Sequence, residues 1–238
     1  MTLAGHQPAY LPYLGLFYKM IQCDKFMFVD HAQFEKKAYQ NRNYVRSTTG
    51  QVLLTVPVQT KGRFLQGTDE VMIDNSLPWA RKHWRTIWLN YHDAPFFTDH
   101  QPFFERTYAE TWKRLVDLNV SLTLYLMKSF GIDKEVVFSS RYDIKGERTA
   151  MLIDMCQKTG ADTYISGWGG KSYVDLDAFR CAGLSHRFVR LSHPAYPQRA
   201  QPFIPNLSAI DLLFNCGPES RRILDEAAKL STIERCDV

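Results

Sequence analysis

The stretch His6-Gln7-Pro8-Ala9-Tyr10-Leu11-Pro12-Tyr13-Leu14-Gly15 lies between a short apolar run that begins at Met1 and a helical pattern that ends near Cys23. A second strand-like run, KFMFVD at residues 25–30, follows directly. This order of strand, polar turn, helix and strand predicts a βαβ unit. Two prolines and a glycine restrict the turn, so His6, Gln7 and Tyr10 are expected to project from it. Ligands of open α/β sheets bind at that edge.

Strand and helix patterns alternate near both ends of the chain, which predicts one mostly parallel sheet. The run LLTVPV at residues 53–58 has apolar residues on both faces, as a buried central strand does, although Pro57 favours an end or an edge there. A weaker strand is expected at residues 71–74. Later strands are predicted at residues 136–140, 163–167 and 186–191, and helices at 148–159, 174–182, 208–215 and 218–230.

The middle of the chain has a different pattern, because aromatic residues recur there at helical spacing. One helix is predicted from Pro78 to about Asn90, and two more between residues 101 and 131, separated near Asn119. Glycine at position 160 is expected to end the helix before it, and Ser208 to cap the start of a late one. We therefore predict a single α/β domain over residues 1–238. Its mostly parallel sheet has flanking helices and is interrupted by a helical insertion or cap at residues 78–131.

Composition excludes several classes of protein. The chain has 238 residues, a net charge of +4 and 45% hydrophobic residues, which is typical of a globular protein. The charge is too small for nucleic-acid binding by bulk electrostatics, and no window has the ~20 apolar residues that span a bilayer. Without a signal-peptide pattern, we expect a cytoplasmic protein. Five cysteines without CxxC spacing, and histidines without ligand spacing, indicate no metal site.

Four polar clusters follow or flank the predicted strands, and parallel topology predicts that they converge. Each cluster supplies candidate substrate-binding side chains. The clusters are His6, Gln7 and Tyr10; Asp30, Gln33, Asn41, Arg42 and Asn43; Ser166, Gly167, Gly170, Lys171 and Tyr173; and Tyr196, Gln198, Ser208 and Asp211.

Three of these residues are candidate catalytic groups, namely His6, Asp30 and Lys171. A carboxylate at Asp30 would orient the His6 imidazole and raise its pKa, unless Asp30 only stabilises a turn. Lys171 ends a glycine-rich turn that could approach a phosphate, although its spacing is not that of a P-loop and a plain surface turn fits equally well. Arg42 offers a fork suited to a carboxylate or diphosphate, or to a surface ion pair.

Several ordered blocks of the sequence resemble the WbqC-like family. They are HQPAYLPYLGLFYKM at residues 6–20, DKFMFVDHAQF at 24–34, NRN at 41–43, LLTVPV at 53–58, YISGWGGKSY at 164–173 and FIPNLSAIDLLFNCG at 203–217. The resemblance implies a role like that of proteins encoded with surface-polysaccharide (O-antigen) genes, where amino-deoxy sugars receive glycine-like acyl groups. The opening βαβ pattern also looks like nucleotidylyltransferase-type adenylating ligases such as pantothenate synthetase, but with one histidine in place of an HxGH pair.

Together these observations predict an amide-forming (amino)acyl transferase or ATP-dependent ligase that modifies a nucleotide-linked amino sugar. The expected partners are that phosphorylated small molecule and a small carboxylic or amino acid, and the protein could form a homo-oligomer. ATP with magnesium, or acyl-CoA as an alternative donor, would supply the driving force. A different class remains open, in which the protein is a non-catalytic ligand-binding or assembly protein of the same pathway.

Overall fold

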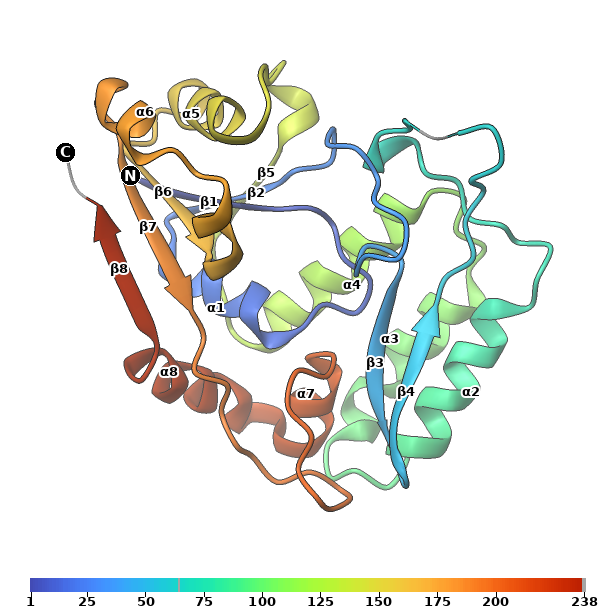
Figure 1. Cartoon of the computed structure of the whole chain (residues 1–238). Helices are drawn as coiled ribbons and strands as arrows, with labels where there is room; N and C mark the ends of the chain where they lie inside the picture. Colours follow the sequence, from blue (N-terminus) through green and yellow to red (C-terminus); the bar gives the residue numbers. More distant parts are fainter. Residues whose placement is uncertain (64, 237–238) are drawn as a thin grey trace.

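A six-stranded sheet forms the centre of the computed structural model, which describes residues 1–63 and 65–236 (Figure 1). The strand order is β5-β2-β1-β6-β7-β8, and the first five strands are parallel, whereas β8 runs antiparallel to β7. The predicted α/β class with a mostly parallel sheet is therefore confirmed. The strands are β1 (Thr2–His6), β2 (Lys25–Phe28), β5 (Glu135–Phe138), β6 (Thr163–Gly167), β7 (Ser185–Arg190) and β8 (Thr232–Cys236).

Helices cover both faces of this sheet, as the buried sides of parallel strands require. Leu3 and Met27 point to one face, where α5 (Arg148–Thr159) and α6 (Leu176–Cys181) supply the partners of one apolar cluster. Their neighbours in the two strands, Ala4 and Phe26, point to the other face and belong to the larger apolar cluster there. That cluster includes residues of α1 (Leu14–Gln22) and α8 (Ser220–Lys229). Gly160 ends α5 with a φ of 71°, the left-handed conformation predicted for it.

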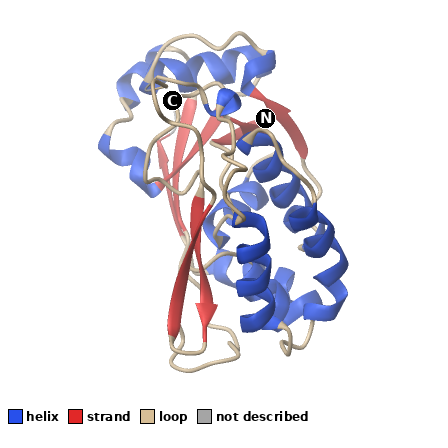
Figure 2. Ribbon diagram, turned by 90° about the vertical axis from the view of Figure 1, so that its right-hand side faces the viewer, coloured by secondary structure: helices blue, strands red, loops and turns tan. Residues whose placement is uncertain are grey.

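A second body of structure extends beside the sheet and contains a β-hairpin and most of the remaining helices (Figure 2). The hairpin pairs β3 (Arg42–Ser47) with β4 (Gly50–Thr55) in antiparallel register. Between the hairpin and β5 the chain forms α2 (Trp79–Tyr91), α3 (Phe97–Ala109) and α4 (Leu115–Ser129). A later helix, α7 (Ile210–Cys216), shares a core with them, because Phe214 contacts the rings of Tyr91, Phe97 and Phe104.

The predicted central strand at residues 53–58 is wrong, because these residues do not join the main sheet. The strand there is β4, whose only ladder among the described residues is with β3. Leu53 is 38% exposed, while its neighbour Leu54 is 3% exposed. One face of this strand is therefore buried and the other is exposed, which its apolar composition alone does not indicate. The expected strand at residues 71–74 is also absent, since Met72 and Ile73 make only isolated bridges, to Arg114 and Val58.

The predicted helix break near Asn119 is wrong as well. The chain leaves helix between Ala109 and Leu115, and Asn119 lies within α4. Its side-chain amide donates to the carbonyl oxygens of Pro8 and Gln40 at 3.2 and 2.7 Å, so a residue with low helix propensity is stabilised by tertiary contacts. Ser208 precedes α7 by two residues but does not occupy its cap position, which belongs to Ala209.

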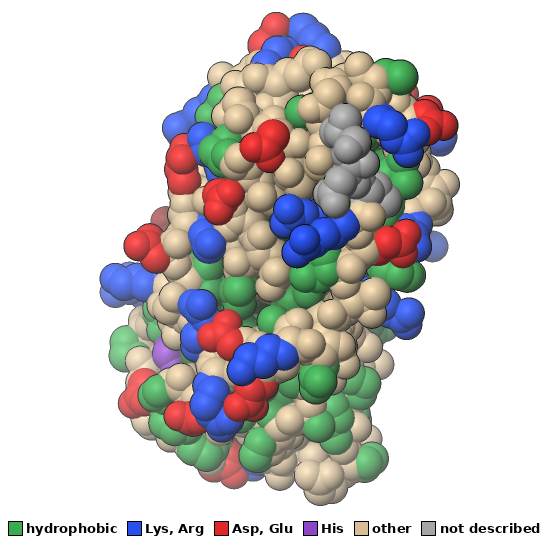
Figure 3. Space-filling model, turned by 90° about the vertical axis from the view of Figure 1, so that its left-hand side faces the viewer, with side chains coloured by type: hydrophobic (Ala, Val, Ile, Leu, Met, Phe, Trp, Pro, Cys, Tyr) green, Lys and Arg blue, Asp and Glu red, His purple; other side chains and the backbone are tan. Residues whose placement is uncertain are grey.

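Surface charge is mixed on the face over β8 and α8, where acidic and basic side chains alternate (Figure 3). None of the helices formed by residues 1–63 and 65–236 combines the length and hydropathy needed to cross a bilayer.

Candidate functional site

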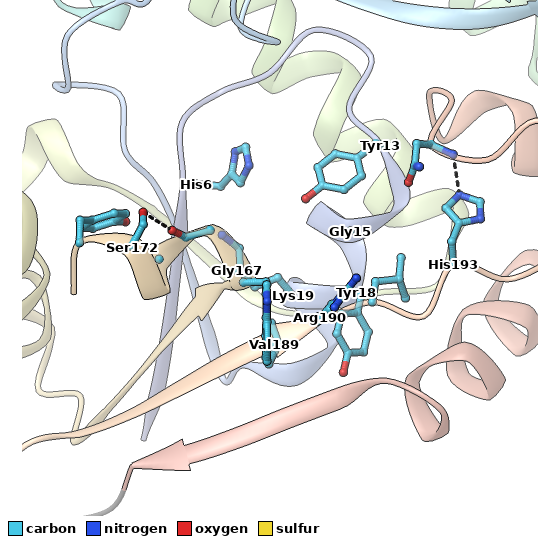
Figure 4. A pocket seen from close by; sticks show the side chains of 16 residues that line it. His6, Tyr13, Gly15, Tyr18, Lys19, Gly167, Ser172, Val189, Arg190 and His193 are labelled. Carbon is cyan, nitrogen blue, oxygen red and sulfur yellow. Dashed lines mark hydrogen bonds between the residues drawn. The ribbon is translucent and has the colours of Figure 1, made fainter. Parts of the chain in front are cut away.

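A cavity of about 580 Å³ lies at the carboxyl ends of three strands, β1, β6 and β7. His6, Gly167 and Arg190, the last residues of those strands, line it together with residues of α1 (Figure 4). Strand order reverses between β1 and β6, so this is the topological switch point of the sheet, where ligands of open α/β folds bind. We call this cavity the switch-point cleft. Its volume is within the range of small-molecule sites.

A second cavity of about 450 Å³ adjoins the cleft and shares three residues with it, His6, Tyr13 and Asn206. Its other walls include Ala9, Pro12 and the half-exposed ring of Tyr39, so it is mostly apolar. The combined space has a polar end at the carboxyl ends of β6 and β7 and an apolar annex beside the turn after β1. A ligand with one charged and one planar or apolar part matches this division.

Lys19 is the most unusual residue of the cleft. It lies in the last turn of α1, is 6% exposed, and its Nζ donates a hydrogen bond of 2.6 Å to the carbonyl oxygen of Gly5. Burial lowers the pKa of Lys19 to about 8, so the group is still largely charged at neutral pH. Among the described residues no carboxylate forms an ion pair with it. A buried charge without a counter-charge indicates that an anion completes this site.

His6 has the opposite electrostatic character from the one predicted. Its Nδ1 lies 2.7 Å from the carbonyl oxygen of Gln7, and because a carbonyl only accepts, Nδ1 carries the proton and Nε2 is an acceptor. Burial, then the charge of Lys19, lower the pKa of His6 to about 3, while the bond to Gln7 opposes this. His6 is therefore a neutral imidazole that accepts a hydrogen bond from a ligand, rather than a cation that holds phosphate.

The glycine-rich turn forms the far wall of the cleft, but its lysine does not. Gly167, Gly170 and Tyr173 line the cavity, whereas Lys171 forms an ion pair with Glu234 over 2.6 Å. Lys171 also lies over the ring of Trp168, which lines the cleft, with Nζ 4.2 Å from the ring centre. The predicted convergence of His6 and Lys171 in one cleft is not what the structure shows.

Arg190 supplies the second basic group that lines the cleft. It ends β7, is exposed, and its guanidinium carbon lies 5.8 Å from the centre of the Trp168 ring. Within the part of the chain that the structure describes, no acidic side chain pairs with Arg190. Lys19 and Arg190 thus make the polar end of the cleft cationic.

The predicted pair of His6 and Asp30 does not form. Asp30 lies beyond the end of β2, where its carboxylate accepts hydrogen bonds from the Ser139 hydroxyl and from the backbone amide and hydroxyl of Ser140. Asp30 therefore lines a different cavity from His6. Gln7 is bound by Gln40 at 2.6 Å, and its own amide donates weakly to the carbonyl of Gln33 at 3.4 Å.

Most of the other predicted binding residues make hydrogen bonds within the protein. Tyr10 is fully buried and its hydroxyl bonds to His83 and Tyr108. Asn41 and Asn43 are buried and donate to the carbonyl oxygens of Val56 and Leu11, although Asn43 also borders the apolar annex. Ser166 is buried against His186 at 3.0 Å. Arg42 begins β3 and lines neither cavity, so the structure does not bring it to the cleft.

The last predicted cluster is a buried hydrogen-bond network. Asp211 is fully buried and accepts hydrogen bonds from Tyr91, Tyr196 and Gln198 at 2.8 to 2.9 Å. Burial raises the pKa of Asp211, while those donors oppose the shift. Ser208 is also fully buried, so this cluster joins α7 to the rest of the core rather than facing a ligand.

Sequence reasoning missed most of the residues that make the cleft. Lys19 stands among apolar residues in LGLFYKM, and Arg190 stands near the end of a predicted strand. Each position is only a weak indication of a functional residue. Tyr13, Trp168, His193 and Asn206 also line the cleft, and none of them was among the predicted site residues. Over residues 1–63 and 65–236 there is no group of three or more His, Cys, Asp or Glu side chains that could hold a metal ion.

Comparison with known proteins gives the family. The model of the WbqC-like protein family matches residues 7–223. The chain belongs to this family. The WbqC-like chain is also 34% identical over 218 residues to "Uncharacterized protein Rv1507c" of Mycobacterium tuberculosis (strain ATCC 25618 / H37Rv), an alignment that covers 90% of this chain and 93% of that protein. No solved structure gives a significant match to the WbqC-like chain. The resemblance drawn from its sequence blocks is therefore confirmed at the level of the family.

Proposed function

We propose that the protein is an amide-forming enzyme, an (amino)acyl transferase or ATP-dependent ligase, that acts on a nucleotide-linked amino sugar in surface-polysaccharide biosynthesis. The observation that carries the proposal is the buried, uncompensated Lys19 in the switch-point cleft. A phosphorylated ligand supplies the missing negative charge, and Arg190 adds a fork for a second phosphate oxygen.

The apolar annex supports a nucleotide in particular. Its half-exposed rings, Tyr13 and Tyr39, offer a surface for a planar base or a sugar face. A nucleotide sugar combines a diphosphate with such groups. It would therefore use both the cationic and the apolar part of the space.

The neutral state of His6 gives it a role in amide formation that a cation could not have. Its Nε2 lone pair can accept a hydrogen bond from the amino group of the sugar and orient that amine toward the acyl carbon. The new bond joins the amine nitrogen to the acyl carbon, the bond from that carbon to the donor's leaving group breaks, and the leaving group departs with the electron pair. The amine nitrogen loses one proton, which passes to the leaving group or to water. ATP would first convert the free acid to an acyl-adenylate with release of pyrophosphate, or acyl-CoA would bring an activated thioester.

A binding protein without catalysis is the rival, and one observation favours it. The cleft lacks the His6–Asp30 pair that would raise the basicity of His6, because Asp30 is bound by Ser139 and Ser140. Such a protein would hold the same phosphorylated ligand and carry out no transfer.

The test has a binding stage and a turnover stage. Thermal unfolding is first measured with UDP- and dTDP-linked amino sugars, ATP and acetyl-CoA, each alone, for the native protein and for Lys19→Met. The proposal expects stabilisation by a nucleotide sugar that Lys19→Met abolishes. Amide product is then sought with glycine, ATP and magnesium, or with acetyl-CoA. Stabilisation without product from either donor supports the binding protein, and no stabilisation by any nucleotide contradicts both.

A further inference from the structure

A third cavity lies on the other side of β1 from the switch-point cleft. Its volume is about 440 Å³, and it opens at the carboxyl ends of β2 and β5, where Asp30, Phe138 and Ser140 line it. The opposite wall comes from the start of α4 and from the 3-10 turn at Thr68–Glu70. We call it the β2–β5 pocket. Unlike the switch-point cleft, it contains charges of both signs.

Two carboxylates form the acidic side of the β2–β5 pocket. Asp30 is 5% exposed and is held rigidly by three hydrogen bonds from Ser139 and Ser140. Asp69 is tied to the same strand end, because its backbone amide donates to the carbonyl oxygen of Asp30 at 2.9 Å. Burial and the charge of Asp30 raise the pKa of Asp69. Both carboxylates contribute to raising the pKa of Arg114, but that guanidinium is bound to Asp117. Neither Asp30 nor Asp69 forms an ion pair within the described residues, so a cation can still bind between them.

Two arginines form the basic side, and only one of them is engaged. Arg114 makes a bidentate ion pair with Asp117, with distances of 2.9 and 2.7 Å. Arg141 lies with its guanidinium carbon 5.1 Å from the centre of the Phe138 ring and has no ion pair in the described part of the chain. A guanidinium placed against an aromatic ring keeps its donor edge available, and that edge matches a carboxylate.

We propose that the β2–β5 pocket binds a free α-amino acid. Its carboxylate pairs with Arg141, and its ammonium group lies between Asp30 and Asp69. A simple anion would satisfy only the arginine, and a simple cation only the two carboxylates, whereas a zwitterion with adjacent charges satisfies both. The pocket is large enough for a small amino acid and polar enough to hold its charges.

The position of the pocket relates it to the switch-point cleft. His6 pairs with Phe28 in the sheet, and the amide of Val29 donates to the carbonyl of His6 at 2.9 Å, so Asp30 directly follows the strand next to His6. Neighbouring strands are about 4.8 Å apart. The two sites thus flank one strand end. The role of the amino acid as the acyl donor rests on the proposed function, whereas its binding does not.

Calorimetric titration of the whole protein tests this inference directly. The α-amino acids are titrated one at a time, beginning with glycine, and the amino acid that binds is compared with its N-acetyl and its amide derivative. The first derivative lacks the ammonium group and the second lacks the carboxylate. We expect binding by at least one amino acid and at least tenfold weaker binding of both derivatives. Binding by no amino acid, or equal binding of either derivative, would overturn the proposal.

Two variants and two matched controls locate the site. Arg141→Gln and Asp69→Asn should each weaken amino-acid binding at least tenfold, whereas Arg180→Gln and Asp177→Asn, which break an exposed ion pair on α6, should leave it unchanged. Circular dichroism confirms that each variant is folded. Amino-acid binding that neither pocket variant changes overturns the proposal. A protein that binds an amino acid but no nucleotide sugar contradicts only the proposed function, and the reverse result contradicts only this inference.

Discussion

The ammonium group of Lys19 lies 2.6 Å from the carbonyl oxygen of Gly5, on the inner wall of the switch-point cleft. This contact satisfies one of three donors and leaves the charge without a carboxylate partner in the described residues. If this buried charge is kept to bind a ligand, an apolar side chain should replace it at little cost in stability, because burial of a charge opposes folding. Replacing Lys19 can therefore show whether its ammonium group serves ligand binding or protein stability.

Lys19→Met should abolish stabilisation by a nucleotide sugar and leave the free energy of unfolding of the unliganded protein unchanged or higher. Methionine fills a similar volume without a buried charge. Urea denaturation with and without ligand measures both effects. Lys229→Met, at an exposed position of α8, is the matched control and should change neither. A loss of several kcal/mol in Lys19→Met without ligand would show that the lysine is structural.

Affinity for the phosphorylated ligand should fall as pH rises above about 8. The pKa of Lys19 is about 8 in the free protein, so the ammonium is present below that value and is lost above it. Dissociation constants measured between pH 6.5 and 9.5 should show this decline, and Lys19→Met should lack it. An affinity that stays constant over the whole range would mean that Lys19 does not contact the ligand.

Stability should fall as pH falls below about 6.5, partly through His186. Burial lowers the pKa of this fully buried histidine to about 4, so the unfolded chain binds its proton first as pH falls. The folded state therefore loses at most about 1.4 kcal/mol per pH unit from this group between pH 6.5 and 4. Urea denaturation at pH 7 and pH 5 should show a smaller difference for His186→Phe than for the native protein. His92→Phe, at an exposed site, should keep the native difference.

Leu54→Ala should destabilise the protein by about 2–5 kcal/mol, whereas Leu53→Ala should cost less than about 1 kcal/mol. Leu54 is 3% exposed and belongs to the main core, while Leu53 is 38% exposed on the other side of β4. Equilibrium denaturation of the two variants compares them directly. Equal losses of unfolding free energy in the two variants would contradict the burial of only one face of β4.

Local patterns predicted the parallel sheet well and the hairpin poorly. Apolar runs and turn residues such as Gly160 depend on near neighbours, and those parts of the fold were correct. The hairpin depends on distant contacts. Arg46 of β3 is 2% exposed because its guanidinium donates to the carbonyl oxygens of Gly50 and Pro202, and nothing in the sequence around it indicates this.

The residues of the switch-point cleft also divide into those that local sequence predicts and those that depend on distant contacts. The strand-end rule predicted that His6, Gly167 and Gly170 would lie near one another, and all three line the cleft, because the rule needs only the order of the strands. It failed for Tyr10 and Asp211, whose partners Tyr108 and Tyr91 lie 98 and 120 residues away in the chain. It also missed Lys19, because no pattern within α1 distinguishes a lysine that faces a cavity from one that faces water.

Trp168 gives the cleft an optical property of its own. Its ring lines the cavity beside Lys171 and Arg190, whereas the other four of the five tryptophans lie between positions 79 and 112, and none of those lines the cleft. An anion that draws Arg190 away from the indole, or a base that stacks on it, alters the emission of one fluorophore against a steady background. Occupancy of the cleft can therefore be followed by intrinsic fluorescence, without a label and before any product is known.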